Sequence, residues 1–445
     1  MKSIRTVLLA GAMLTAGALA AAAAGFLTNG LPVAGGAQFP STLPLTGNET
    51  LPADTNLTAG QSPQSEAVTL SQVGSYSAGV LAGSFRNVLV GGDAATNLWQ
   101  RGTTGAGVTT TVTYGGPDRW AYWSGASTSM TVSKTTTAAD LPSGVGITAG
   151  FKMNRTNGQT GLVQMCMIQE VESVNVSQLV GQTVEFSFWA TAGATFSASN
   201  SNLTAVILTG TGTDEGVSKA AFAYNAGGGG SGAWTGQATT FTGNVAISTT
   251  PTKYAAVATI PSTTTEIAAL ICYTPASATN SAATDYVALA HIQLSRNTSL
   301  ASAVGTISAA NGNAASAFDR RPQGIETALQ QRYFYRLTES AAITPVAPCA
   351  AVDTTHTNCF VTFPVTMRTV PTMSYTAGFA SPTSTTQATL GACSALATSA
   401  VVTSTAVNPQ GALVYCTATT IPAAGVASFL YSNNGSGVIS ASAEL

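Results

Sequence analysis

Apolar and polar residues alternate between residues 85 and about 298, and this pattern limits the fold more than any other feature of the sequence. In the segment 184–189, Phe186 and Phe188 lie two positions apart, which places both on one face of a strand. Similar segments occur at 203–209, 254–260, 267–273 and 286–294, and clusters of Gly, Ser, Pro and Asn separate them. Strands of this kind predict a double-sheet jelly roll in an all-β chain.

The composition supports this fold class and limits the partners. Charged residues make up only 8% of the chain and apolar residues 45%, so there is enough apolar material for β cores. The net charge is −2 and the basic residues are scattered, which argues against a nucleic-acid partner. Two histidines, His291 and His356, leave little for metal or acid–base chemistry.

The carboxylates do not form a recognisable catalytic pair. Sugar hydrolysis needs two facing carboxylates, and none of the candidates has an evident partner in the sequence: Glu170, Glu172, Asp214 and Glu215. No G-x-S-x-G motif occurs, and the run G-G-G-G-S-G lacks the lysine of a phosphate-binding loop. We therefore expect a protein that is not an enzyme and that needs no cofactor, although a pair assembled across a subunit boundary stays open.

Residues 1–25 have the features of a targeting segment. Lys2 and Arg5 precede an uncharged, alanine-rich run that ends near Gly25. A basic start before an apolar segment predicts a secretory signal peptide, and a retained anchoring helix is the alternative. The modest hydrophobicity of the run argues against a permanent membrane span.

Residues 26–84 are rich in turns and poor in large apolar side chains. They contain a short repeat, S-T-L-P-L-T-G-N followed by E-T-L-P-A-D-T-N. Pro44 and Pro52 each remove a backbone donor, which predicts edge or isolated strands. We interpret the segment as an extended attachment strip that becomes ordered on a partner, with a flexible linker as the alternative.

Charge is concentrated in the linker, residues 301–337. Six of the 34 charged residues (16 basic and 18 acidic) fall between Asp319 and Arg336. After Pro322 and Gly324, apolar residues recur on one helical face at Ile325, Leu329 and Tyr333. A helix of about ten residues is not stable alone, so we expect it to pack on a neighbouring domain or on copies of itself.

This linker also carries a family resemblance. The run F-D-R-R-P-Q-G-I-E-T-A-L-Q-Q-R-Y-F resembles the hinge of many phage and prophage fibre-type proteins, although Gln330 stands where that family usually has Cys. Three other segments are similar to the family: N-V-L-V-G-G-D-A-A-T-N-L-W-Q-R-G at 87–102 with D-R-W at 118–120, F-P-V-T-M-R-T-V-P-T-M at 363–373, and S-A-E-L at 442–445. The resemblance implies a carbohydrate-binding-like (galactose-binding-like) jelly roll at 85–300, joined by the hinge to a small C-terminal β domain at 338–445.

Six cysteines without C-x-x-C spacing argue against zinc. Small β domains with thin cores gain most from cross-links, so we predict two disulfides in the C-terminal domain and two buried thiols in the jelly roll. The predicted disulfides are Cys349–Cys359 and Cys393–Cys416, and the predicted thiols are Cys166 and Cys272. A virion protein that matures in a reducing cytosol would become oxidised only after lysis.

Aromatic residues are the candidates for sugar binding. Trp234 follows the glycines at 227–230, so we predict that it stands on a loop at the rim as a ligand-binding residue. Tyr122 and Trp123, at the end of a predicted strand, are assigned the same role. The alternative is that Trp234 folds back on its own domain or packs on a neighbouring subunit. Asp285 precedes a strand where related jelly rolls place a carboxylate near a structural calcium, and a turn-capping role is the alternative.

The partners follow from the linker helix and from the resemblance. Fibre-type proteins are usually trimers, so we expect a homotrimer that buries Ile325 and Leu329 and places Arg332 and Arg336 beside the carboxylates of Asp319 and Glu326. The sequence thus predicts a virion fibre, spike or capsid-decoration protein that attaches by its N-terminal region to other virion proteins and binds a host-surface glycan. The alternative is a secreted, extracellular bacterial lectin-like surface protein.

Overall fold

The computed structural model describes residues 50–54, 65–69, 86–103, 112–125, 130–219, 233–278, 282–338, 344–376, 378–382, 390–393, 395–398, 406–418, 424–433 and 437–445. The chain divides into two compact units after Gly83. In the first unit, strand β1 (Thr50–Asp54) pairs antiparallel with β2 (Ser65–Thr69), and Pro52 lies in β1. The predicted segment 1–25, Pro44, and the glycine loop at 227–232 lie outside the described residues. None of the described helices is long and apolar enough to cross a membrane.

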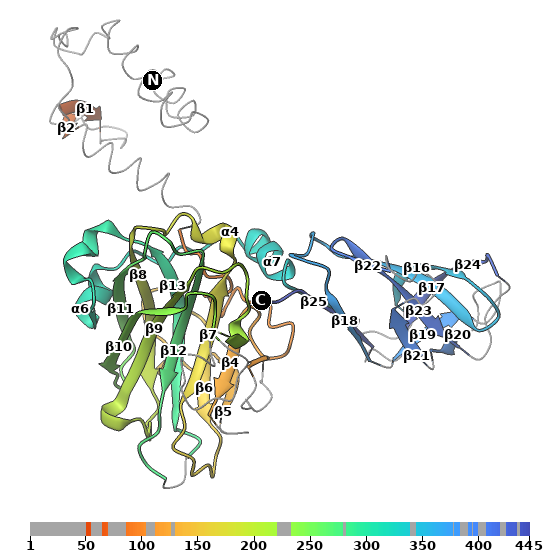
Figure 1. The fold of residues 1–445 in the computed structure, drawn as a ribbon, viewed down its shortest axis with the longest axis horizontal. Helices are drawn as coiled ribbons and strands as arrows, with labels where there is room; N and C mark the ends of the chain where they lie inside the picture. The colour runs from red at the N-terminus through yellow and green to blue at the C-terminus, as the bar shows by residue number, and fades with distance from the viewer. Residues whose placement is uncertain are drawn as a thin grey trace, which may run out of the picture. The chain divides into compact units, whose positions relative to one another are not determined.

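The second unit begins with a β-sandwich, which confirms the predicted all-β jelly-roll fold. Each of its two antiparallel sheets has six described strands (Figure 1). The first sheet has the order β10 (Ala238–Ala246), β9 (Asn202–Gly210), β12 (Glu266–Tyr273), β7 (Met165–Val171), β4 (Ala121–Ser124) and β3 (Thr113–Tyr114). The second has the order β14 (Ile307–Ser308), β11 (Thr252–Thr259), β8 (Thr183–Ala192), β13 (Tyr286–Arg296), β6 (Gly150–Arg155) and β5 (Met130–Thr135).

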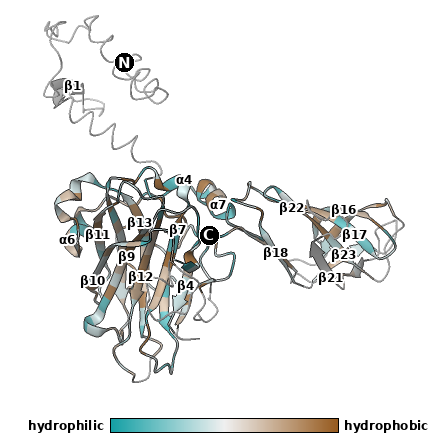
Figure 2. Cartoon of the chain, in the orientation of Figure 1, coloured by the Kyte–Doolittle hydropathy of each residue, from teal (hydrophilic) through white to brown (hydrophobic). Residues whose placement is uncertain are grey.

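The alternating pattern of β8 explains how the main core forms. Val184, Phe186 and Phe188 point between the sheets, where the ring centroids of the two phenylalanines lie 5.5 Å apart. Trp189 belongs to the opposite face of the strand and is half-buried there. Apolar residues accordingly dominate the strands of the sandwich (Figure 2). Burying such side chains contributes about 1.5–3 kcal/mol each, which is what holds the two sheets together.

Short helices connect and flank the strands. They are η2 (Ala138–Asp140), α4 (Ser173–Val176), η3 (Ser199–Ser201), η4 (Thr298–Ala303), α6 (Ala309–Ala314) and α7 (Gln323–Gln331). The last two lie in the linker between the sandwich and the C-terminal domain, and η4 leads into it. The predicted short linker helix is confirmed as α7, which begins directly after Pro322.

The C-terminal domain has a core of its own, which includes Val361, Val414 and Leu430. A small sheet has the order β15 (Phe334–Thr338), β25 (Val438–Ser442) and β18 (Thr372–Tyr375). The larger sheet has the order β20 (Leu390–Ala392), β19 (Phe379–Pro382), β24 (Ala427–Ser432), β16 (Pro345–Ala351), β17 (His356–Thr362), β23 (Gly411–Thr417) and β21 (Ala395–Thr398), and β22 (Val407–Asn408) also pairs with β23.

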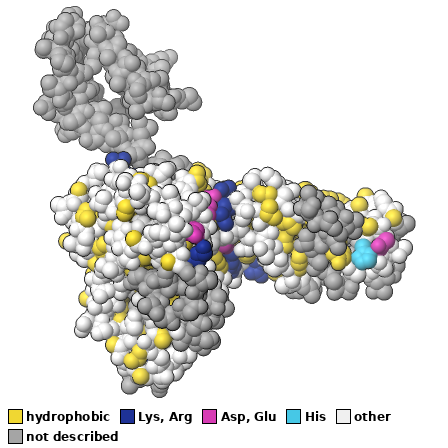
Figure 3. Space-filling model, in the orientation of Figure 1, with side chains coloured by type: hydrophobic (Ala, Val, Ile, Leu, Met, Phe, Trp, Pro, Cys, Tyr) yellow, Lys and Arg dark blue, Asp and Glu magenta, His cyan; other side chains and the backbone are white. Residues whose placement is uncertain are grey.

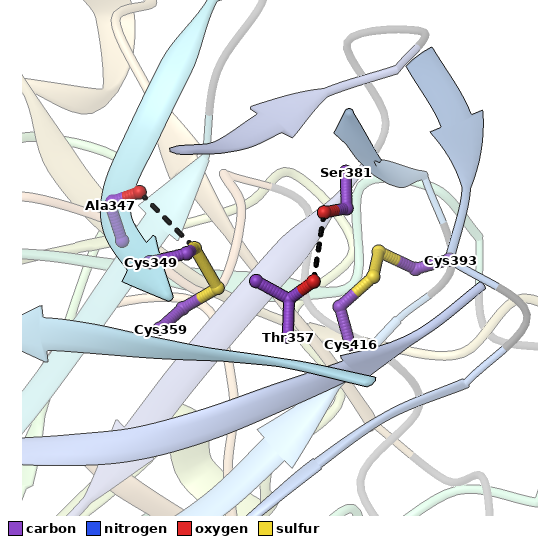
Figure 4. Close-up of a disulfide and its surroundings, with 7 residues drawn as sticks. All are labelled: Ala347, Cys349, Thr357, Cys359, Ser381, Cys393 and Cys416. Atoms are coloured by element: carbon purple, nitrogen blue, oxygen red, sulfur yellow. Dashed lines mark hydrogen bonds between the residues drawn. A yellow bond between two sulfur atoms is a disulfide. The ribbon is translucent and has the colours of Figure 1, made fainter. Parts of the chain in front are cut away.

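Three disulfides cross-link the second unit. Cys349–Cys359 joins β16 to β17, and Cys393–Cys416 lies close by, so both predicted bridges are confirmed (Figure 4). The prediction of two thiols in the sandwich is wrong, because Cys166 and Cys272 are also bridged. These two residues stand directly opposite each other in β7 and β12, with Cα atoms 4.1 Å apart.

Candidate functional site

The aromatic residues predicted to bind a ligand are buried. Trp234 is only 2% exposed, and its indole Nε1 donates to the carbonyl oxygen of Gly216 at 3.0 Å. Trp123 lies in the same cluster, and Tyr122 points into the main core. The prediction that these three residues form an exposed sugar site is therefore wrong. For Trp234, the alternative in which the side chain folds back on its own domain matches the structure.

The reason is a second apolar layer on the outer face of the first sheet. Strands β7, β9 and β12 bury both of their faces: Ile267, Ala269 and Ile271 point inward, while Ala268 and Leu270 point outward. The outward side chains need a cover, and the indole of Trp234 and the side chain of Val217 supply it. Continuous apolar runs such as I-A-A-L-I at 267–271 were the available sequence signal, because a strand that is covered on both sides loses its alternation.

Asp285 is part of an ion pair instead of a calcium site. Its carboxylate accepts hydrogen bonds from the backbone N–H and the hydroxyl of Ser197 and lies 3.5 Å from Nη1 of Arg155. All of these contacts are buried or partly buried, and the arginine already supplies the positive charge that a cation would bring. Across the described ranges, no group of three potential metal ligands occurs. The residues present do not fit a calcium ion, so this prediction is corrected.

The main polar feature of the described chain is a joint between the sandwich and the C-terminal domain. We use the term joint for α7 together with its contacts to residues 87–102, 118–119, Glu172 and Glu444. Charged side chains gather on the visible face where the two domains meet (Figure 3). The contacts form three groups, described in turn below.

The first group binds the backbone of the loop that precedes the sandwich strands. The carboxylate of Glu326 accepts from the N–H of Gly91 and pairs with Arg321 at 2.8 Å. Gln330 accepts from the N–H of Leu98 at 2.8 Å, and Asp319 accepts from the N–H of Asn87 at 3.1 Å. Buried backbone groups need such partners, so these side chains provide hydrogen bonds that no strand supplies.

The second group lies at the C-terminal end of α7. Arg332 pairs with Glu172 at 2.7 Å, and the hydroxyl of Tyr333 donates to the same carboxylate at 2.8 Å. The guanidinium of Arg119 lies 3.6 Å from the centre of the Tyr333 ring, a cation–π geometry. Burial, opposed by the nearby Arg119, raises the pKa of Tyr333 to about 12. The phenol therefore stays protonated and keeps donating at any physiological pH.

The third group holds the end of β25 against the sandwich. Glu444 pairs with Arg119 at 2.6 Å and with Arg101 at 3.1 Å. Arg101 also approaches Asp118 at 3.4 Å. Burial raises the pKa of Asp118 to about 6, although Arg101 acts in the opposite direction. Asp118 therefore becomes protonated as the pH falls through about 6, which would weaken its attraction to Arg101.

The residues predicted to bury α7 in a trimer have other surroundings within one chain. Ile325 is 40% exposed, and Leu329 is half-buried. The face of the helix that packs inward is polar and carries Glu326 and Gln330. We expected Arg332 and Arg336 beside the carboxylates of Asp319 and Glu326 in a trimer, and within one chain they have other partners. Arg332 binds Glu172 and Arg336 donates to the carbonyl oxygen of Gln100 at 2.7 Å.

The carboxylates considered for catalysis are placed in different settings. Asp214 pairs with Arg368 at 3.2 Å, and Glu215 pairs with Lys219 at 3.0 Å. Glu170 is buried in β7, and its pKa is raised to about 8, first by burial and then by the charge of Glu266. Glu170 is therefore protonated at neutral pH.

Comparison with known proteins gives no sequence match: neither a protein-family model nor a curated protein matches this chain. Among solved structures, the enzymatically active domain of tailspike protein 4 from bacteriophage CBA120 is similar with 12% identity and a TM-score of 0.27, over 45% of this chain and 23% of that one. A structure described as "CBM4 structure and function" is similar with 14% identity and a TM-score of 0.20, over 33% of this chain and 71% of that one.

A third similar structure contains the CBM22-1 and GH10 modules of xylanase 10B from Clostridium thermocellum, complexed with xylohexaose. It has 11% identity and a TM-score of 0.24, over 43% of this chain and 28% of that one. The chain thus spans less than a third of the length of two of these three structures. Scores at this level establish neither a family nor a function for this chain.

Proposed function

We propose that this chain is a structural and adhesive component of a virion, a fibre, spike or capsid-decoration protein. In this proposal its N-terminal region attaches to other virion proteins, the chain assembles as a homotrimer, and the sandwich is displayed toward a host-surface glycan. The proposal assigns the chain a binding role and no catalytic one. The ion pairs of Glu172, Asp214 and Glu215 with Arg332, Arg368 and Lys219 support that part.

The observation that carries the proposal is the joint. Segments that resemble fibre-type proteins lie far apart in the sequence, at 87–102, 118–120, 318–334 and 442–445. Hydrogen bonds and ion pairs connect these segments directly: Glu326 binds Gly91, Gln330 binds Leu98, and Arg119 binds Glu444. The resembling residues thus share one physical task, which is to fix the C-terminal domain to the sandwich. A fixed connection between binding modules suits a protein that works outside the cell.

A secreted lectin-like surface protein is the second candidate function, and two observations favour it. Residues 1–25 have the charge and hydropathy pattern of a signal peptide. All six cysteines are bridged, which is typical of proteins that mature in an oxidising compartment. Both candidates share the glycan-binding role and differ in where the protein resides.

Mass spectrometry of purified particles and of the culture medium tests the proposal. The virion role predicts peptides from this chain in the particle fraction, with Met1 retained. A mature N-terminus near Gly25, found only in the medium, would overturn the virion role in favour of secretion. The adhesive role is tested separately by adsorption of the labelled, purified chain to host cells and by competition with glycans released from those cells. Adsorption that such glycans fail to reduce would refute it.

A further inference from the structure

The larger sheet of the C-terminal domain turns an aromatic surface outward. In β17, Cys359 and Val361 point into the domain core, so Phe360 points out; in β24, Leu430 points in and Phe429 points out. Phe360 is 48% exposed and Phe429 is 43% exposed. They are the aromatic members of the exposed large hydrophobic side chains among the described residues. Aromatic rings left this accessible on a sheet with a complete core beneath are not needed to hold that core.

The two rings stand in one row across the sheet. Phe429 of β24 lies opposite Pro348 of β16. On the other side of β16, Cys349 faces Cys359 and Ala350 faces Asn358, so the same register places Phe360 opposite Pro348. The two phenylalanines are therefore separated by two strand spacings, about 10 Å. This separation is close to the length of one disaccharide unit in an extended glycan.

Polar groups flank the row. The neighbouring row contains Asn358 of β17 and, opposite it, Tyr415 of β23. The ring of Tyr431 meets Phe429 edge-on, with centroids 6.3 Å apart. At the end of β17, Nδ1 of His356 lies 2.8 Å from the carboxylate of Asp353. An amide and phenols beside exposed rings supply the hydrogen bonds that sugar hydroxyls require.

The charge of this surface identifies the class of ligand. Strands β16, β17, β23 and β24 contain no Asp, Glu, Lys or Arg. A surface of this kind offers nothing to a phosphate or to an acidic polysaccharide, and it matches a neutral ligand. The face is also interrupted by small and polar residues such as Ala350, Asn358 and Thr362. A stable interface between copies needs about 800 Å² of well-packed surface on each partner, so this face fits a glycan better than a second copy of the chain.

We propose that this surface, formed by Phe360, Phe429, Asn358, Tyr415 and Pro348, binds a neutral, extended glycan. The two phenylalanine rings stack on sugar rings that are one disaccharide apart, and Asn358 and Tyr415, which lie in the neighbouring row on β17 and β23, bind hydroxyl groups at the Phe360 end of the glycan. The site lies on the C-terminal domain, so it is separate from any ligand site of the sandwich. It also holds whether the chain resides on a virion or is secreted.

Affinity gel electrophoresis of the full chain with soluble hydroxyethyl cellulose, xylan and galactomannan tests the assignment. We expect at least one of these neutral polysaccharides to retard the wild type. Phe360→Ala and Phe429→Ala should each weaken binding about tenfold, and the double variant should abolish it, whereas Phe360→Trp should keep it. Leu162→Ala, which removes an equally exposed apolar side chain from the sandwich, is the matched control and should bind normally.

Three results would overturn the assignment. They are a wild type that none of the three polysaccharides retards, a double variant that binds like the wild type, and a double variant whose native mass differs from that of the wild type. The last result would identify the surface as an interface between copies. Thermal unfolding of the variants should be unchanged, because both rings are nearly half exposed. Failure here leaves the proposed function standing, since that is tested by particle composition and cell adsorption.

Discussion

Replacing Glu170 with glutamine should make the sandwich more resistant to alkaline conditions. The pKa of this buried carboxyl is raised from 4.5 to about 8, mainly by burial and next by the charge of Glu266. The folded chain therefore keeps a proton that the unfolded chain releases above about pH 4.5. Below that pH, Glu170 is protonated in both states and does not lower the free energy of unfolding. As the pH rises through about 8, its preference for the neutral form in the folded chain lowers the free energy of unfolding by the full amount. The difference corresponds to about 5 kcal/mol, at about 1.4 kcal/mol per pH unit.

The assay is urea unfolding followed by tryptophan fluorescence at about pH 5 and about pH 9. All five tryptophans lie in the sandwich sequence, so the signal reports this domain alone. The free energy of unfolding of Glu170→Gln, relative to wild type, should rise by several kcal/mol between the two pH values. Parallel pH dependences of the two proteins would refute the reasoning, because they would mean that Glu170 ionises in the folded chain without cost.

Glu215→Gln is the matched control and should have the opposite sign. Hydrogen bonds from the backbone of Thr235 and from Lys219 lower the pKa of Glu215. Its contribution to stability is therefore present above the ordinary pKa of a glutamate and is lost as the pH falls. Removing the charge should weaken the protein at neutral and alkaline pH and have little effect in acid.

Three further predictions concern assembly, cross-linking and the joint. Ile325→Asp with Leu329→Asp should convert a trimer to monomers or aggregates, and a native mass showing a stable monomer of the unmodified chain would contradict the trimer. Cys166→Ser with Cys272→Ser removes a bridge between residues 106 positions apart and should lower the free energy of unfolding by roughly 4–5 kcal/mol. Non-reducing peptide mapping of the wild type should find this bridge, and free thiols at the two positions would contradict it. Glu444→Gln leaves the buried guanidinium of Arg119 without its ionic partner, which should lower the free energy of unfolding by about 3–5 kcal/mol. Limited proteolysis should then cut the linker more readily, and an unchanged digestion pattern would show that the joint does not need this pair.

The sequence was sufficient to predict the sandwich because apolar segments of strand length, some of them alternating in polarity as 184–189 does, are separated by clusters of turn residues. It was not sufficient where burial depends on a distant segment. The glycines before Trp234 indicate a loop, but they do not indicate that the outer face of β12 is apolar and needs a cover. For Cys166 and Cys272, the bridge depends on the register of two strands about a hundred residues apart, which the spacing alone does not determine.

The linker helix is a second case in which a distant segment decides which side chains are buried. Its apolar residues predicted a face formed by Ile325 and Leu329, because hydrophobic periodicity is the usual sign of the buried side. Within one chain the structure buries Glu326 and Gln330, since the loop at 87–98 offers backbone N–H groups to the helix. The hydrogen-bonding needs of a distant backbone segment do not change the apolar periodicity of the helix, so its orientation was not predictable from that periodicity.

The way α7 binds that loop also affects how such chains can change. Glu326 and Gln330 recognise the N–H groups of Gly91 and Leu98, and Arg321 recognises the carbonyl oxygen of Leu89. Every residue type carries the carbonyl, and all but proline carry the N–H, so these contacts of α7 depend on the path of the loop backbone and not on the identity of the residues that they bind. A sandwich with a different ligand preference, but with the same loop path, would then fit the same helix and terminal domain. The pairs of Glu172 with Arg332 and of Glu444 with Arg119 would still tie the joint to particular side chains of the sandwich.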